Sequence, residues 1–147
     1  MKNTLIMMVV AIILGGISGM ILFSKYKDTS YVFNENKKLY FLEEGVYSTK
    51  ESLESNTKDI NPKLVIQDDN KYHVYVGITS NFDNVSKIKK MYKDKGYSIY
   101  EKEIEVDNSE FTSNISQFDI LLESSKNDSD ISTIEEVVLS NYENLIS

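Results

Sequence analysis

The sequence predicts an α+β domain that lies between a transmembrane helix and a pair of C-terminal helices. Three observations lead to this prediction. Residues 4–23 form an uncharged apolar run, residues 39–53 are repeated at 71–85, and residues 109–147 carry apolar side chains at helical spacing. The repeat is the most informative of these features, because it defines the order of strands and helices in the domain.

The apolar run has the length of one membrane-spanning helix. About 20 residues cross a hydrocarbon core of ~30 Å, and residues 4–23 contain no charged side chain. The alternative is a cleaved signal peptide, which the positive start at Lys2 and the small residues Gly15 and Gly16 permit. Because the apolar run continues beyond those small residues, we expect an uncleaved anchor, followed by a linker over residues 24–38.

The charges that flank this run give a weak signal for its orientation. Lys25 and Lys27 follow the run, whereas Lys2 alone precedes it. By itself, the positive-inside rule therefore favours a cytoplasmic domain.

The composition excludes several classes of function. All 23 acidic residues lie after Lys27 and every basic residue is lysine, so the polar part lacks the arginine-containing basic patches of nucleic-acid-binding proteins. The absence of cysteine removes disulfides, thiolate metal sites and cysteine nucleophiles. The sequence also shows no nucleophile–base set, metal-ligand cluster or phosphate-binding glycine loop. We therefore expect no enzyme, no cofactor, no metal ion and no nucleic-acid partner.

The repeat consists of two strand–turn–helix units. The first reads LYFLEEGVYSTKESL from Leu39, and the second reads KYHVYVGITSNFDNV from Lys71. The matched pairs are Tyr40 with Tyr72, Leu42 with Val74, Gly45 with Gly77, Val46 with Ile78, Ser48 with Ser80, Glu51 with Asp83 and Leu53 with Val85.

In the first unit, a strand that begins at Leu39 is followed by a helix over residues 49–59. Ser48 and Glu51 form a capping box, in which the hydroxyl and the carboxylate each accept from a free N–H at the helix start. Residues 62–67 then form a short strand, since proline is tolerated at the first position of a strand. The sequence Asp-Asp-Asn that follows predicts a turn into the second unit.

In the second unit, apolar side chains alternate along a strand, as a strand with one buried face requires. Ser80 and Asp83 repeat the spacing of the helix cap, Gly96 ends the helix, and residues 97–106 form the last strand. The alternating residues are Tyr72, Val74, Val76 and Ile78, and the helix has an apolar stripe of Val85, Ile88, Met91 and Tyr92.

These elements follow one another as β-α-β-β-α-β, the split βαβ or ferredoxin-like (RNP-like) arrangement. In it, the two repeat-bearing strands lie at the centre of an antiparallel sheet, with both helices on one face. The tail over residues 109–147 is expected to add two helices, separated by a polar hinge at residues 124–130.

The two units, with the sequences YFLEEGVYSTKESL and YHVYVGITSNFDNV followed by KKMYKDKGYSIY, resemble the SPOR domain, the sporulation-related repeat of bacterial envelopes. The resemblance covers residues 39–106, and the order of span, linker and domain is also similar to that family. It implies a noncatalytic module that binds peptidoglycan glycan strands stripped of their stem peptides, at division or sporulation septa. It also implies a single-pass protein of the cell membrane with an extracytoplasmic C-terminal domain. The sequence departs from the family pattern at Glu43, Glu44 and Thr79.

Strand alternation predicts a binding surface on the sheet face that lacks helices. There, Gly45 and Tyr47 face away from the helices and Val46 faces toward them. Aromatic rings suit the C–H faces of sugars, polar groups suit their hydroxyls, and exposed apolar patches usually mark contact surfaces. The candidate glycan-binding residues are Phe41, Glu43, Tyr47, His73, Tyr75 and Tyr100. Glu43 and Glu44 cannot flank one glycosidic bond, because neighbouring strand residues point to opposite faces.

Three alternatives stay open at this stage. The two C-terminal helices are amphipathic, and packing onto the same sheet face would bury its aromatic rings. A second class of function is a protein–protein adaptor of a membrane-bound division or sporulation complex, which would contact envelope partners through these helices. The lysines between positions 87 and 95 are expected to form a solvated helix face, with attraction to anionic lipid headgroups as the alternative.

Overall fold

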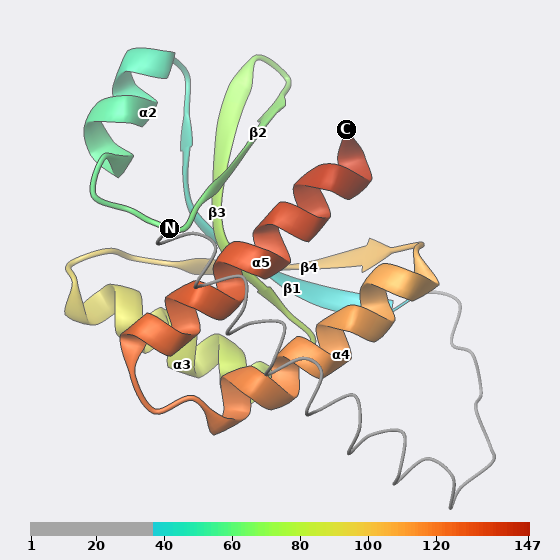
Figure 1. The fold of residues 1–147 in the computed structure, drawn as a ribbon. Helices are drawn as coiled ribbons and strands as arrows, with labels where there is room; N and C mark the ends of the chain where they lie inside the picture. The colour runs from blue at the N-terminus through green and yellow to red at the C-terminus, as the bar shows by residue number, and fades with distance from the viewer. Residues whose placement is uncertain (1–36) are drawn as a thin grey trace, which may run out of the picture. The chain divides into compact units, whose positions relative to one another are not determined.

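The computed structural model describes residues 37–147, which form one sheet and a set of helices around it. The predicted transmembrane helix over residues 4–23 lies outside the described residues. Among residues 37–147, no helix has the length and apolar character that crossing a membrane requires. The elements are β1 (Lys37–Tyr47), α2 (Lys50–Thr57), β2 (Leu64–Asp68), β3 (Lys71–Thr79), α3 (Phe82–Asp94), β4 (Tyr100–Val106), α4 (Ser109–Ser124) and α5 (Asp128–Ile146) (Figure 1).

The four strands form an antiparallel sheet in the order β2-β3-β1-β4. This order places the repeat-bearing strands β1 and β3 at the centre, as the element order predicts. β1 begins at Lys37, so the last two residues of the predicted linker belong to the sheet. The predicted turn joins β2 to β3, and both Asp69 and Asn70 have positive φ angles, of 46° and 59°. Such a turn follows the right-handed twist of the two strands.

The pairing of β1 with β3 is irregular in the middle of both strands. It shifts by one residue between Leu42 and Glu43, and shifts back between Glu43 and Gly45. Such shifts are typical of β-bulges, where an extra residue interrupts the alternation of side chains between the two faces. In β1 the extra residue is Glu44.

The bulge reverses the faces of the last residues of β1. Val46 lies opposite His73, and Tyr47 lies opposite Tyr72. Since cross-strand partners share a face, Val46 shares the face of His73 and Tyr47 lies on the other one. The predicted faces of Gly45, Val46 and Tyr47 are therefore wrong, because alternation was continued through a position at which it is broken.

Two helix caps also differ from the prediction by one residue. Thr49 caps α2 in place of Ser48, and Asn81 caps α3 in place of Ser80. In each case the side-chain oxygen accepts a hydrogen bond from a backbone N–H in the first turn. Ser80 is engaged elsewhere, because its hydroxyl donates to Asp119 on α4 (2.5 Å).

α3 packs on one face of the sheet, which we call the α3 face. The apolar stripe predicted for this helix is buried in one cluster with side chains of β1 and β3. Gly96 has a φ of 90° and ends the helix as predicted. The members of the cluster are Leu42, Ile60, Val76, Val85, Ile88, Met91, Tyr92, Ile99, Leu122 and Ile131.

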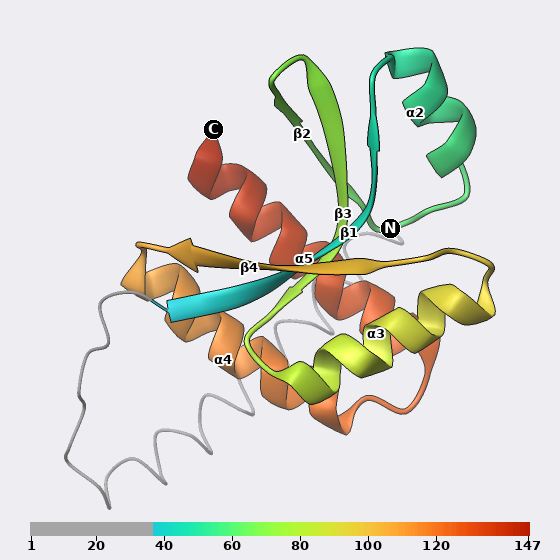
Figure 2. The same cartoon turned by 180° about the vertical axis from the view of Figure 1, so that it is seen from behind.

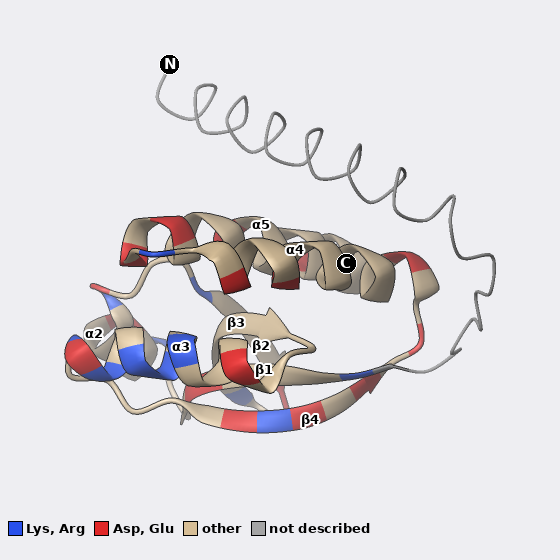
Figure 3. Cartoon of the chain, turned by 90° about the horizontal axis from the view of Figure 1, so that it is seen from below, with Lys and Arg blue, Asp and Glu red and all other residues tan. Residues whose placement is uncertain are grey.

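α4 and α5 cover part of the opposite face, which we call the α5 face. Figure 3 shows the two helices as one layer above the strands. Figure 2 shows the sheet from the α3 face, with α5 behind the strands. Phe41 is 1% exposed beneath them, with its ring centroid 4.9 Å from that of Tyr142 on α5. Phe111 of α4 lies 5.4 Å from the same tyrosine ring. The prediction of a helix-free face is therefore wrong over this part of the sheet, and the alternative that the tail covers it is confirmed.

Candidate functional site

The part of the α5 face that stays accessible carries a cluster of three polar side chains. Glu43 of β1 is at its centre. Lys102 Nζ of β4 donates to Glu43 Oε1 at 2.8 Å and lies 2.7 Å from Oε2, while His73 Nδ1 of β3 lies 2.7 Å from Oε1. Because a carboxylate only accepts hydrogen bonds, His73 Nδ1 carries the proton in this contact. We call these three residues the Glu43 cluster.

The Glu43 cluster depends on the register of three strands. Glu43 lies opposite Tyr75 on β3 and opposite Tyr100 on β4. The carboxylate is only 5% exposed, and a buried carboxylate is tolerated only where its oxygens are paired. Lys102 and His73, one from each neighbouring strand, supply that pairing and thereby fix the side chain of Glu43 in place.

Tyr100 is the exposed aromatic residue of this surface. It is the cross-strand partner of Glu43, and it is 64% exposed. Val46, which the bulge turns to the same face, is exposed as well. A ring in solvent beside a fixed and partly exposed cation can hold a ligand that has both an apolar face and polar groups.

The other two predicted rings on this face are buried. Phe41 lies beneath α5, and Tyr75 is 7% exposed. The ring of Tyr75 stacks with the imidazole of His73, with 6.4 Å between the centroids. Burial raises the pKa of Tyr75 to about 12, and the negative charge of Glu43 adds to this effect. Tyr75 therefore packs against His73 of the Glu43 cluster and is too buried to offer a surface to a ligand.

Tyr47 is separated from the other candidates by the bulge in β1. Its hydroxyl donates to Glu44 Oε2 at 2.9 Å. Burial and this hydrogen bond together raise the pKa of Tyr47 to about 12. Of the six predicted residues, the structure brings together Glu43, His73 and Tyr100, of which Tyr100 is exposed, His73 is partly exposed and Glu43 is buried.

Lys102 completes the cluster, although the sequence did not single it out as a site residue. The signal that identifies it is the register of β4. Lys102 lies two residues after Tyr100 in one strand, and therefore on the same face.

A second polar arrangement lies where β3 extends beyond β2. The pairing of β2 with β3 ends at Tyr75, so the later residues of β3 have no strand on that side. Glu135 of α5 accepts from the backbone N–H of Ile78 at 2.9 Å, and Asp119 of α4 accepts from that of Ser80 at 3.1 Å. Two carboxyl groups thus take the place of the missing strand as acceptors for the edge amides.

Glu135 is buried in this arrangement, and one of its oxygens is unpaired. Burial raises the pKa of Glu135 well above its ordinary value, with a further contribution from Asp119, although the hydrogen bond from Ile78 opposes the shift. Among the described residues, Oε1 has no hydrogen-bond partner. This environment favours the protonated form of the carboxyl group.

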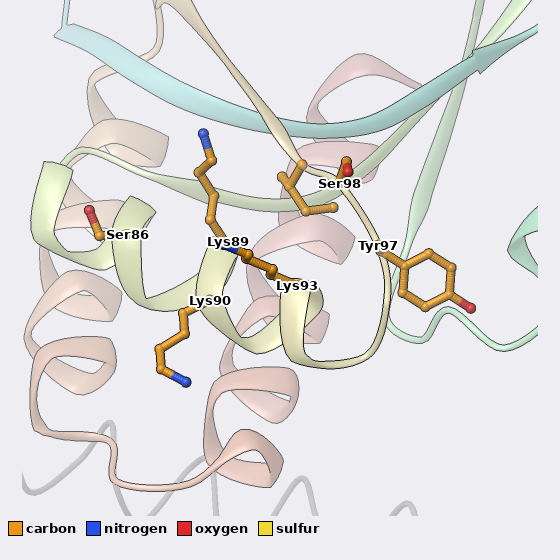
Figure 4. A pocket seen from close by; sticks show the side chains of 7 residues that line it. Ser86, Lys89, Lys90, Lys93, Tyr97 and Ser98 are labelled. Atoms are coloured by element: carbon orange, nitrogen blue, oxygen red, sulfur yellow. The ribbon is translucent and has the colours of Figure 1, made fainter.

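An open groove of about 430 Å³ lies between α3 and the segment that leads into β4 (Figure 4). A smaller one of about 190 Å³ lies between α5 and residues 61–64. The larger groove is lined by Ser86, Lys89, Lys90, Lys93, Tyr97, Ser98 and Ile99.

The polar groups of these two arrangements are engaged with one another or with the backbone. Within residues 37–147, no three acidic or histidine side chains are grouped so that they would hold a metal ion. The carboxylate of Glu43 is paired with Lys102 and His73, while the carboxyl groups of Asp119 and Glu135 accept from backbone amides. The fold and the site thus describe a small α+β domain with an exposed ring and a partly exposed lysine side by side on one face of its sheet.

Comparison with known proteins gives a match to one solved structure. No protein-family model matches the chain, and no curated protein matches it at a significant level. The chain is similar to the solution structure of the peptidoglycan binding domain of the B. subtilis cell wall lytic enzyme CwlC, at 25% identity over 52% of this chain and 96% of that one. The TM-score of 0.39 is too low for a fold or a ligand to be carried over from that domain.

Proposed function

We propose that this chain is a noncatalytic module that binds peptidoglycan glycan strands outside the cell, at division or sporulation septa, and is held at the membrane by its N-terminal helix. The observation that carries the proposal is the Glu43 cluster beside the exposed ring of Tyr100. The resemblance of the two sequence units to the SPOR repeat supports it, as does the central position of both units in the sheet.

The chemistry of such strands fits this surface. Each sugar has a C–H face that can stack on an aromatic ring, and hydroxyl groups that need hydrogen-bond partners. Glycan that has lost its stem peptides also carries free lactyl carboxylates, so the polymer is anionic. Lys102 supplies a partly exposed cation for these groups, and its contact with Glu43 holds the ammonium beside Tyr100.

The position of this cation is important because the chain as a whole is acidic. The formal net charge is −7 at pH 7, which repels an anionic polymer at long range. Salt screens such repulsion beyond about 8–10 Å. Lys102 at the contact surface lies within that distance of a bound glycan, so its attraction is less screened than the repulsion from the more distant acidic residues.

The alternative of a protein–protein adaptor has weaker support from the packing of the tail. α4 and α5 bury most of their apolar side chains against the rest of the domain, including Phe111, Ile115 and Val138. The large apolar residues that they leave exposed are Ile120, Leu145 and Ile146.

The test is co-sedimentation of the full chain, in a neutral maltoside detergent, with purified wall sacculi before and after amidase treatment. We expect more chain in the pellet after treatment. Tyr100→Ala and Lys102→Gln should each weaken this binding about threefold or more, because each removes one stacking or charged contact.

Matched controls separate this surface from general effects of ring and charge. Phe82→Ala removes another exposed aromatic ring, on α3, and Lys38→Gln removes a lysine of β1 that pairs with Glu103. Both controls should pellet like the wild type. A folded chain that pellets with neither kind of sacculus would refute the proposed function.

A further inference from the structure

We propose that the groove between α3 and residues 97–99 is a second binding site, which takes the phosphate group of a phosphate ester. None of its lining residues belongs to the Glu43 cluster or is Tyr100. The inference therefore goes beyond glycan binding and does not depend on it.

Two lysines, Lys87 on α3 and Lys95 directly after it, make contacts that hold the fold together. Lys87 Nζ donates to three backbone carbonyl oxygens at the C-terminal end of α4, at 2.6 to 3.1 Å. Lys95 lies 3.8 Å from Asp128 and 5.5 Å from the ring centroid of Tyr92. These contacts explain part of the lysine run without any ligand.

The remaining three lysines of the helix line the groove. Lys89 pairs with Glu101, and Lys90 lies 2.5 Å from Asp94. Lys93 forms no ion pair with any residue in the described part of the chain. Exposed ion pairs add little net stability, so an incoming anion can recruit Lys89 from its carboxylate at small cost.

The side chains differ in how they are placed around the groove. In Figure 4, Lys89 and Lys93 extend from the part of α3 that faces the segment with Ser98, whereas Lys90 points away from it. Lys89 and Lys93 are therefore the direct ligands in this proposal, with the hydroxyl of Ser98 as a third donor. Lys90 adds positive charge at longer range.

A phosphate group is the anion that suits these donors. Its tetrahedral oxygens accept from several directions, which matches separate ammonium and hydroxyl donors, whereas a planar carboxylate is best matched by an arginine fork. The groove volume of about 430 Å³ leaves room for the ester group as well as for the phosphate. The phosphate can come from a lipid headgroup or from a soluble ester, and both offer the same chemistry to the site.

The test uses the full chain in a neutral maltoside detergent, observed by backbone amide NMR. One arm titrates glycerol 3-phosphate at constant ionic strength, and the other adds phosphatidylglycerol to the micelles. We expect saturable shifts of the amide signals of Lys93, Ser98 and Ile99 in at least one arm, and the arm that produces them identifies the source of the phosphate.

Two variants and one control make the result specific. Lys89→Gln with Lys93→Gln should weaken binding at least about fivefold, since two charged contacts are lost. Ser98→Ala, which leaves every charge in place, should weaken it about two- to fivefold. Lys50→Gln with Lys71→Gln changes the net charge equally at exposed positions outside the groove, and should bind like the wild type. The proposal is overturned if neither arm gives saturable shifts, or if the double variant of the groove binds as well as the control.

Discussion

At the scale of single residues, Gly77 is required by the carboxyl group that approaches it. A Cβ at this position would lie 3.1 Å from both Cδ and Oε2 of Glu135. That carboxyl group is held by its hydrogen bond from Ile78, so it cannot withdraw without losing the contact. Gly77→Ala should therefore lower the free energy of unfolding by about 1–3 kcal/mol, the usual cost of overpacking a core. Denaturant unfolding of the full chain in neutral detergent measures the loss.

The other glycine of the repeat provides the control. A Cβ at Gly45 would meet the hydroxyl of Tyr47 at 3.2 Å, which is the far end of a half-buried side chain that can move. Gly45→Ala should therefore cost less than Gly77→Ala. Equal losses in the two variants would contradict the role given to Glu135.

Glu135 should also make the stability of the chain depend on pH. Its pKa in the folded state is raised well above the ordinary value of 4.5, so the folded chain holds this proton more tightly than the unfolded chain. The stability from this group is complete below the ordinary pKa and is lost as pH rises towards the folded pKa.

Glu135→Gln tests this dependence, because the amide cannot ionise but keeps an oxygen to accept from Ile78. We expect the free energy of unfolding to fall in the wild type as pH rises above the ordinary carboxyl pKa of 4.5, and to fall less in the variant. Comparing the two chains removes the contribution of the other titrating groups. Parallel curves would show that burial of this carboxyl group does not govern the pH dependence.

At the scale of elements, the sequence predicted each strand and helix between residues 37 and 147, but not every face. Alternation assigned Phe41 and Glu43 correctly and failed after Glu44. Glu44 puts a charged side chain where alternation expects one that faces the helices, but this alone does not distinguish a bulge, which adds a residue and reverses the faces that follow, from a polar residue in a regular strand. The predicted positions of the two helix caps were each wrong by one residue. Neighbouring residues are equally good caps there (Ser48 and Thr49, Ser80 and Asn81), and tertiary contacts decide between them.

The surface against which α4 and α5 pack also could not be predicted from the sequence. Their apolar spacing shows that each helix buries one face, but it does not show against which surface. The acceptors Asp119 and Glu135 give no signal either, because an acidic residue on a helix is usually solvated. Their role follows from the shortness of β2, which leaves the N–H groups of Ile78 and Ser80 without a strand partner.

The attachment of α4 to the sheet can be tested through Phe111. This ring is buried against Tyr142, and replacing a buried phenylalanine with alanine usually costs about 3–5 kcal/mol. Phe111→Ala should loosen α4 and speed hydrogen exchange at the N–H of Ser80, which Asp119 of the same helix protects. Ile120→Ala, at an exposed position of α4, should leave that exchange rate unchanged. Equal rates in the two variants would show that α4 does not protect the edge of β3.

At the scale of the whole molecule, the tail divides the α5 face into a covered part and an accessible part. The covered part holds Phe41 and the ring of Tyr75, and the accessible part holds Tyr100 and Lys102. If the surface binds glycan as proposed, the cover limits how many rings a sugar chain can reach. Loosening the end of α5 should then increase binding, because further aromatic surface becomes available next to Tyr100.

Tyr142→Ala tests this expectation, because Tyr142 packs on both Phe41 and Phe111. Amidase-treated sacculi should bind this variant about two- to tenfold more tightly than the wild type, as expected for one or two added stacking contacts. Faster hydrogen exchange at the N–H of Phe41 would show that the cover has loosened. Leu145→Ala, at an exposed position near the end of α5, should change neither quantity. If exchange at Phe41 rises while pelleting stays constant, the rings beneath α5 serve only to pack the tail, and glycan binding is confined to the surface around Tyr100.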